Sequence, residues 1–172
     1  PAGPTAAATT TDHSLIAVVG ADGLVRVLDS AGAVSKEWKV PGAPITSLVF
    51  HPLAAPPKEN TAEPVPVIAT AGTDGAVRLW NYATAEPVDS FHGSTVAIES
   101  LAFRADGQQL VSGAADGAIS VWNPEGVASE VFDGTVEQPG RAVALSVDGR
   151  HLATASVSSG RAAIIIFDLQ TK

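Results

Sequence analysis

Two sets of residues in this chain are of types that could do chemistry, and both are spread along its length. The imidazole nitrogens of four histidines could bind a metal ion: His13, His51, His92 and His151. Two aspartates that each precede a glycine, Asp74 and Asp116, could supply a pair of catalytic carboxylates. Whether either set can act together depends on the elements that position its members.

The composition limits the classes of partner. The chain has 172 residues, of which 45% are hydrophobic and 16% charged, so it can form one ordinary domain with a substantial core. It is acidic, with a formal net charge of −8 and only ten lysines and arginines. Binding to a phosphate backbone or to an anionic membrane requires clustered basic side chains. We therefore expect neither a nucleic-acid partner nor a membrane partner.

The sequence lacks the motifs of the common cofactor and enzyme classes. It contains no cysteine, which excludes disulfides, thiolate-bound zinc, thioether-linked haem and a thiol nucleophile within the chain. It contains neither a G-x-S-x-G nucleophile elbow nor a phosphate-binding loop with its lysine. We therefore expect no cofactor and no catalytic activity from this chain.

The hydropathy and the first residue of the chain leave its location open. There is no methionine, even at the first position, so we expect a processed chain or a fragment of a longer one. There is also no apolar run of transmembrane length and no basic segment followed by an apolar one. Both a cytoplasmic location and a secreted or periplasmic one after processing fit this sequence.

The Asp–Gly pairs belong to a segment that occurs four times. Its copies are "ADGLVRVLD" (21–29), "TDGAVRLWN" (73–81), "ADGAISVWN" (115–123) and the looser "SSGRAAIIIFD" (158–168). The second and third copies start 42 residues apart. In the second copy Val77 and Leu79 face one way and Arg78 and Trp80 the other, a period of two that indicates strands rather than helices.

Further strands flank each copy at matching distances. A strand of small and apolar residues precedes each one, at 15–20, 67–72, 110–115 and 152–157. One strand further back lie 45–50, 98–103 and 142–147, and the same register reaches Thr9. A weaker strand follows the first three copies, at 33–40, 87–93 and 127–134. Each unit thus has four short strands in about 42 residues, the period of a propeller blade.

The repeated segment has a physical explanation as a hairpin. A tight turn needs left-handed backbone at its central residues, and Asp–Gly adopts that conformation at little cost. We therefore expect positive φ at both residues of each pair. Trp80 and Trp122, which end the second and third copies, offer large apolar surfaces to a neighbouring sheet.

These repeats resemble the WD-repeat β-propeller family. The resemblance implies an all-β fold of about four blades with four antiparallel strands each, in one region over residues 1–172. The expected blades cover 5–41, 42–93, 94–135 and 136–172, and the last one lacks its outer strand. Because a propeller must close, we expect half of a larger ring or a ring closed by oligomerisation; a four-bladed ring is the alternative.

The resemblance also implies roles for particular residues. Family blades often hold a hydrogen-bonded set of Trp, Ser or Thr, Asp and His. Matched residue by residue, the second repeat offers Thr70, Asp74 and Trp80, and the third offers Ser112, Asp116 and Trp122. Ser94 occupies the position of the family's histidine, so only a partial version of the set is expected.

In this register we expect neither a metal site from the histidines nor a catalytic pair from Asp74 and Asp116. His13, His51 and His151 fall at turns of different blades, too far apart for one zinc ion, so solvated turn histidines are expected. Asp74 and Asp116 are explained as turn residues.

The candidate interaction sites are loops, which carry specificity on rigid scaffolds. One is the insertion at 53–64, with Pro56, Lys58, Glu59 and Asn60; a merely tolerated insertion is equally compatible. The others are the acidic connection at 133–141, which contains Glu137, and the segment 38–44.

Two functions remain open at this level. The first is a non-catalytic scaffold, bacterial in its composition, which binds protein partners and is completed by another chain or by a second copy. The second is an accessory propeller of a larger, secreted enzyme or cytochrome-type redox protein whose active module lies outside this chain.

Overall fold

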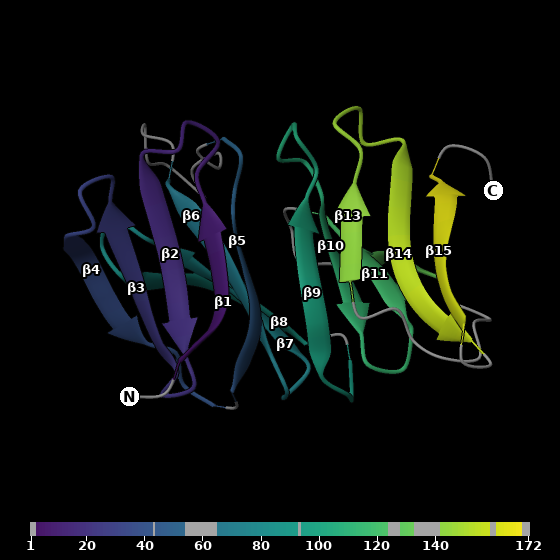
Figure 1. Ribbon diagram of the computed structural model, residues 1–172, viewed down its shortest axis with the longest axis horizontal. Helices are drawn as coiled ribbons and strands as arrows, with labels where there is room; N and C mark the ends of the chain where they lie inside the picture. Colours follow the sequence, from purple (N-terminus) through teal and green to yellow (C-terminus); the bar gives the residue numbers. More distant parts are fainter. Residues whose placement is uncertain are drawn as a thin grey trace.

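The computed structural model describes residues 3–42, 44–53, 65–92, 94–123, 128–132, 142–158 and 161–169. In these residues the regular structure consists of fifteen β-strands in four antiparallel sheets (Figure 1). The prediction of an all-β fold of four repeated units is confirmed. We call the sheets blades 1 to 4 in chain order. No helix in the described parts of the chain has the length and apolarity needed to span a membrane.

Every blade is built from consecutive strands, each pairing with the next. Blade 1 has β1 (Pro4–Thr9), β2 (Leu15–Gly20), β3 (Leu24–Asp29) and β4 (Val34–Lys39). Blade 2 has β5 (Ile45–Phe50), β6 (Val67–Gly72), β7 (Ala76–Asn81) and β8 (Glu86–His92). Blade 3 has β9 (Ile98–Phe103), β10 (Leu110–Ala114), β11 (Ile119–Trp122) and β12 (Ala128–Phe132). In the described residues, blade 4 has β13 (Ala142–Leu145), β14 (His151–Ser158) and β15 (Arg161–Asp168).

The Asp–Gly turns differ from the predicted hairpin in one respect. Gly23, Gly75 and Gly117 have positive φ angles of 73°, 71° and 90°, but the aspartates before them do not. The glycine N–H closes a four-residue turn on a carbonyl three residues back, as Gly75 does on Gly72. The expectation of left-handed backbone at both residues is therefore wrong. The turn is of the type I form with a left-handed glycine after it, in which the aspartate keeps an ordinary φ.

The aspartates of these turns have a second use. Their Oδ1 atoms accept a hydrogen bond from the backbone N–H two residues on, at 3.1 Å for Asp22, 3.2 Å for Asp74 and 3.1 Å for Asp116. This bond satisfies an N–H that the turn would otherwise leave unpaired. The carboxylate is required by the turn itself, which agrees with the structural interpretation of these residues.

The blades are arranged side by side in an open array. The first strands of consecutive blades are neighbours: β1 contacts β5, β5 contacts β9, and β9 contacts β13. Figure 1 shows the resulting order, with β4 of blade 1 and β15 of blade 4 at opposite ends. In the parts of the chain that the structure describes, the ring is open.

The apolar core lies between blades. All residues of the second strands β6 and β10 are buried, because each of these strands is covered on both faces. Their small residues, such as Ala69, Ala71 and Gly113, let the neighbouring sheets approach closely. Trp38 and Val40 are also buried, so the interpretation of 38–44 as an exposed loop is wrong at these two positions. The outer strand β4 buries Trp38 against the next blade.

The turn between β1 and β2 contains a carboxylate with an unusually low pKa. Asp12 accepts hydrogen bonds from the Thr10 hydroxyl at 2.6 Å, the Ser14 hydroxyl at 2.8 Å and the Ser14 backbone N–H at 3.0 Å. These bonds lower the pKa of Asp12 from 3.8 to about 2, and the bond from Thr10 has the largest effect. Hydrogen bonds to the charged form favour it over the protonated acid.

We expect this turn to make folding sensitive to acid in one pH window. Because the pKa of Asp12 is lower in the folded state, the ionised Asp12 stabilises the fold fully above about pH 4. This stabilisation is lost as the pH falls toward 2. The Asp12→Asn variant should therefore lose less stability than the wild type between pH 4 and pH 2. Urea unfolding midpoints measured across this range test it; equal slopes for the two proteins would contradict the assignment.

Candidate functional site

Each blade has two apolar faces with different residues. We call the face toward the following blade the outgoing face and the face toward the preceding blade the incoming face. Three clusters join an outgoing to an incoming face. Between blades 1 and 2 they include Val25, Val27, Leu48 and Ile68; between blades 2 and 3, Val77, Ala71, Leu101 and Leu110; between blades 3 and 4, Ile119, Val121, Val143 and Leu152.

Trp80 lies on the incoming face of blade 2, and Trp122 lies on the incoming face of blade 3. Trp80 is 6% exposed and its ring centroid is 6.1 Å from that of Trp38 in the outer strand of blade 1. Trp122 is 2% exposed and stacks on Phe91 of blade 2, with 5.8 Å between centroids. An aromatic residue of β4 thus covers the tryptophan of blade 2, and one of β8 covers that of blade 3.

Trp80 and Trp122 are each hydrogen-bonded to the residue that the family resemblance assigned to them. Trp80 Nε1 donates to Thr70 Oγ1 at 3.0 Å, and Trp122 Nε1 donates to Ser112 Oγ at 2.9 Å. Thr70 and Ser112 are themselves buried. A buried indole N–H without an acceptor would cost about 1–3 kcal/mol, so these pairs hold the tryptophans in one orientation.

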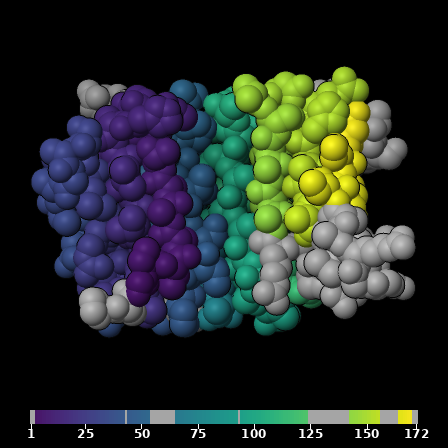
Figure 2. Space-filling view, viewed as in Figure 1, coloured from purple at the N-terminus to yellow at the C-terminus, as the bar shows by residue number. Residues whose placement is uncertain are grey.

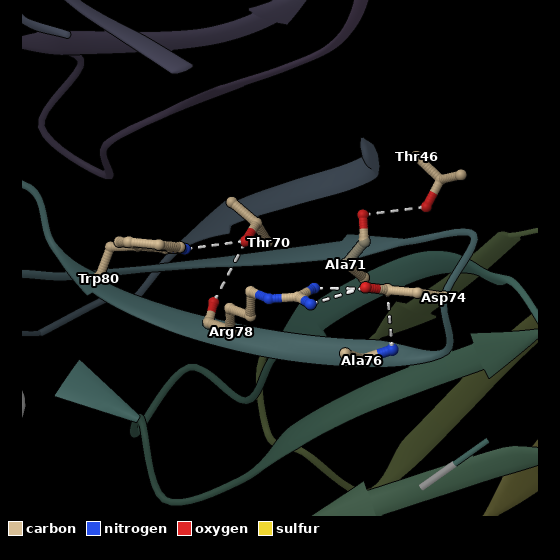
Figure 3. A network of polar contacts seen from close by, with 7 residues as sticks. All are labelled: Thr46, Thr70, Ala71, Asp74, Ala76, Arg78 and Trp80. Atoms are coloured by element: carbon tan, nitrogen blue, oxygen red, sulfur yellow. Dashed lines mark hydrogen bonds and ion pairs between the residues drawn. The ribbon is translucent and has the colours of Figure 1, made fainter. Parts of the chain in front are cut away.

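Asp74 does not belong to the tryptophan's hydrogen-bond set (Figure 3). Its carboxylate forms an ion pair with Arg78, with 2.6 Å between Nη2 and Oδ2. This contact is the main cause that lowers the pKa of Asp74. Figure 3 shows the pair beside the turn, while Thr70 and Trp80 meet further along the blade. The sequence interpretation missed Arg78, although the Asp-x3-Arg spacing recurs at Asp22 and Arg26.

The other two assigned residues are also turn residues. Asp116 bonds the backbone N–H of Ala118, and the position of Arg78 in its blade is taken by Ser120. Ser94, at the family's histidine position, donates to the carbonyl of Val96 at 2.9 Å and accepts from its N–H at 3.1 Å. These bonds shape the entry to blade 3, and the backbone there contacts the turn at Gly75.

The histidines do not converge. In the described residues no group of three or more histidines, aspartates or glutamates could hold a metal ion. His13 and His151 are exposed. His51 differs from the expected solvated histidine: its Nε2 lies 3.1 Å from the Gly107 carbonyl, and its ring packs edge-on against Phe103. It therefore links blades 2 and 3.

The candidate loop residues lie mostly outside the described residues. This applies to Pro56, Lys58, Glu59 and Asn60 of the insertion and to Glu137 of the acidic connection. Leu53, at the start of the insertion, is described and exposed.

The surface most unlike its counterparts is the outgoing face of blade 4. By strand register, Ile164 and Ile166 of β15 occupy the positions of Ile119 and Val121 in β11. Ile119 and Val121 are each 3% exposed, whereas Ile164 is 76% and Ile166 65% exposed. In Figure 2, β15 appears in yellow at one end of the molecule. The positions that bury the core between blades elsewhere are open here.

The incoming face of blade 1 is the second open surface. Ile16 of β2 occupies the position of Ile68, Leu110 and Leu152, which are at most 4% exposed. Ile16 itself is 44% exposed. Val18 and Leu28 take the positions of Thr70 and Trp80, so the hydrogen-bonded pair is replaced by two aliphatic residues. Ile16, Val18 and Leu28 form the apolar part of this face, which also carries the ion pair of Arg26 with Glu37.

Comparison with known proteins agrees with this architecture. Residues 85–123 match the family described as "WD domain, G-beta repeat". Transducin beta-like protein 3 of Bos taurus is 29% identical over 144 residues, which are 81% of this chain and 16% of that protein. Coronin-7 of Pongo abelii is 29% identical over 158 residues, or 86% of this chain and 16% of that protein.

A third relative covers less of the chain. Ribosome biogenesis protein ytm1 of Botryotinia fuckeliana is 27% identical over 110 residues, which are 59% of this chain and 22% of that protein. The chain thus spans less than a quarter of the length of each of these three relatives. None of the three has an enzyme's name. The matched repeat and the four repeated blades are thus similar to those of WD40 repeat proteins.

Proposed function

We propose that this chain is a non-catalytic scaffold that assembles with protein partners, and that the outgoing face of blade 4 is its main assembly surface. One observation carries the proposal: Ile164 and Ile166 are exposed at positions that the other blade interfaces bury, fully or, at Leu79, in part. Burying one such side chain completely is worth about 1.5–3 kcal/mol. An exposed apolar patch of this kind marks an interaction site.

The occupant we propose for this face is the incoming face of blade 1 in a second copy. Within the chain, an outgoing face packs against an incoming face at each of three blade interfaces. The two open faces are one of each kind, so they can pack against each other in the same way. The incoming face offers Ile16, Val18 and Leu28 to the isoleucines of β15. Such a head-to-tail contact is heterologous, and it gives a ring when the rotation closes. Two copies would then form one ring of eight blades.

The absence of catalysis is part of the proposal. The carboxylates of Asp74 and Asp116 accept hydrogen bonds within their turns, and Asp74 also forms an ion pair with Arg78. In the described residues, the histidines belong to no group of three or more ligand-type side chains that could hold a metal ion. The name of one relative, ribosome biogenesis protein ytm1, belongs to a process of assembly, which favours an assembly role over an enzymatic one for this chain.

Sedimentation velocity tests the proposed contact. Over rising concentration, the wild type should shift from the chain mass of 17.4 kDa toward a species of twice that mass. Ile166→Asp places a charge in the apolar contact and should return the protein to the monomer. A charge buried without a partner is strongly unfavourable.

Val147→Asp is the matched control. Val147 is 87% exposed and lies in the turn between β13 and β14, away from the isoleucines of β15. The control should associate like the wild type. A wild type that stays monomeric at high concentration, or a control that dissociates as fully as Ile166→Asp, would overturn the proposed contact.

A further inference from the structure

The connection between the first and second strands begins with a different residue in each blade. The backbone N–H of this residue donates to a carbonyl at or just before the start of the second strand, as Arg104 does to Gln109 at 2.8 Å. By this bond the equivalent residues in blades 1 to 4 are Thr10, His51, Arg104 and Ser146. One backbone position thus carries four different side chains.

At two blade interfaces this side chain reaches the next blade. His51 of blade 2 extends to the corresponding turn of blade 3, where its Nε2 lies 3.1 Å from the carbonyl oxygen of Gly107. Arg104 of blade 3 extends to the corresponding turn of blade 4, and a Cβ added to Gly149 would clash with its side chain. A single large side chain therefore fills the space between the two turns at each of these interfaces.

Between blades 1 and 2 the corresponding space holds a cavity of about 180 Å³. Thr10 lines it, but its side chain is short and its hydroxyl donates to Asp12 of its own turn. Val67 and Tyr82 of blade 2 form part of the opposite wall. Pockets for drug-sized molecules measure about 300–1,000 Å³. The cavity is therefore of the size of one side chain, which is also what occupies the equivalent space at the other two interfaces.

Asp12 gives the wall of this cavity a negative charge. Its three hydrogen bonds all go to Oδ1, so Oδ2 has no partner in the parts of the chain that the structure describes. In blade 3 the equivalent Asp106 accepts a backbone bond through Oδ1 and pairs through Oδ2 with Arg104 Nε, at 3.1 Å. Blade 3 thus supplies a cation to its own carboxylate, whereas blade 1 has a threonine in place of that arginine.

The cavity offers two more acceptors beside Asp12 Oδ2. The hydroxyls of Thr11 and Tyr82 line it, and neither has a hydrogen-bond partner among the described residues. Burial raises the pKa of Tyr82, and the charge of Asp12 raises it further, so the phenol stays neutral and lies within electrostatic reach of the carboxylate. An ammonium group has three N–H donors for three such single acceptors, whereas a guanidinium favours both oxygens of one carboxylate. Lysine therefore fits this site better than arginine.

We propose that the cavity between blades 1 and 2 binds the lysine side chain of a partner polypeptide. The ammonium group pairs with Asp12 Oδ2 and donates to the hydroxyls of Thr11 and Tyr82, and the alkyl stem lies along the apolar atoms of the wall. The lysine takes the place that His51 and Arg104 fill at the other interfaces. This inference goes beyond the proposed assembly contact, because it needs neither open face of the chain.

Two short peptides test the site by nuclear magnetic resonance. The probe is acetyl-Ala-Lys-Ala-amide, and its control carries norleucine, which keeps the alkyl chain without the charge. Titrating the isotope-labelled whole chain with the lysine peptide, up to tens of millimolar, should shift the backbone amide signals of Thr11, Asp12 and Tyr82 in a saturable way. The norleucine peptide should bind about tenfold more weakly, because it lacks the charge-assisted bond to Asp12.

Three protein variants supply the second arm, each with its fold checked by circular dichroism. Thr10→Arg gives blade 1 the arginine of blade 3, so the chain's own cation should fill the cavity and weaken binding of the lysine peptide about tenfold. Asp12→Asn removes the charge and should weaken it to a similar extent. Asp106→Asn is the matched control: it changes the equivalent carboxylate, which Arg104 already occupies, and should bind the peptide like the wild type.

Three results would overturn the inference. They are equal binding of the two peptides to the wild type, equal binding of the lysine peptide to the wild type and to both blade 1 variants, and no saturable shift at the highest concentration. Each of these results is independent of the proposed dimer, because the cavity lies between blades 1 and 2 of one chain.

Discussion

Replacing Trp122 with alanine is expected to lower the free energy of unfolding by about 3–5 kcal/mol, the usual cost of deleting a buried indole. Trp122 is 2% exposed, stacks on Phe91 across the interface of blades 2 and 3, and donates to Ser112. The variant loses the stacking, leaves a cavity and removes the donor from a buried hydroxyl. Urea unfolding followed by circular dichroism measures the loss.

Trp122→Phe separates the contribution of the aromatic ring from that of the indole N–H. A phenylalanine keeps an aromatic ring against Phe91 but has no N–H for Ser112. We expect it to cost less than half of the alanine variant. If Trp122→Ala instead lowers the free energy of unfolding by less than about 1 kcal/mol, the blade interface does not hold the tryptophan as described.

Gly75→Ala is expected to have a similarly large effect, for a reason in the backbone. Gly75 has a φ of +71°, and a Cβ added there would clash with the carbonyl oxygen of Ser94 and lie 2.9 Å from that of Val96. The left-handed conformation costs an alanine about 1–2 kcal/mol, and a clash with backbone typically adds about 1–3 kcal/mol. The turn of blade 2 must then move away from the entry to blade 3.

Gly32→Ala is the matched control for this prediction. Gly32 has a φ of +82°, but an added Cβ would meet no atom within 4 Å. It therefore carries the conformational cost without the clash, and should destabilise the protein by about 1–2 kcal/mol. Equal losses for the two variants, in urea unfolding, would show that the contact between Gly75 and Ser94 is absent in solution.

The repeat pattern predicted the architecture because it reflects local constraints. Small residues such as Ala69 and Ala71 fit only a strand covered on both faces, and an Asp–Gly pair favours a turn wherever it occurs. The fixed distance between Thr70 and Trp80 follows from one hairpin: Thr70 pairs with Arg78, so Trp80, two residues further along β7, lies diagonally opposite on the same face. Such features depend on neighbours within one blade, which a sequence can encode at short range.

The remaining features depend on geometry that the pattern does not specify. The φ of Asp74 depends on which of two turn types the hairpin uses, and both accept Asp–Gly. The sequence predicts a solvated His51, whereas its ring contacts Gly107 of the next blade. The repeat pattern does not specify a contact between blades of this kind. The exposure of Ile164 and Ile166 is not visible in the sequence either, since "IIIF" is equally typical of a buried strand.

Cross-linking between two single-cysteine variants tests the central claim most directly, because the chain has no cysteine of its own. A short bismaleimide added to a mixture of Ile166→Cys and Ile16→Cys should give a species of twice 17.4 kDa that contains one copy of each variant. Val147→Cys mixed with Ile16→Cys should give no cross-linked species, because Val147 lies in the turn between β13 and β14. Equal cross-linking in both mixtures, or none in the first, would contradict assembly through the outgoing face of blade 4.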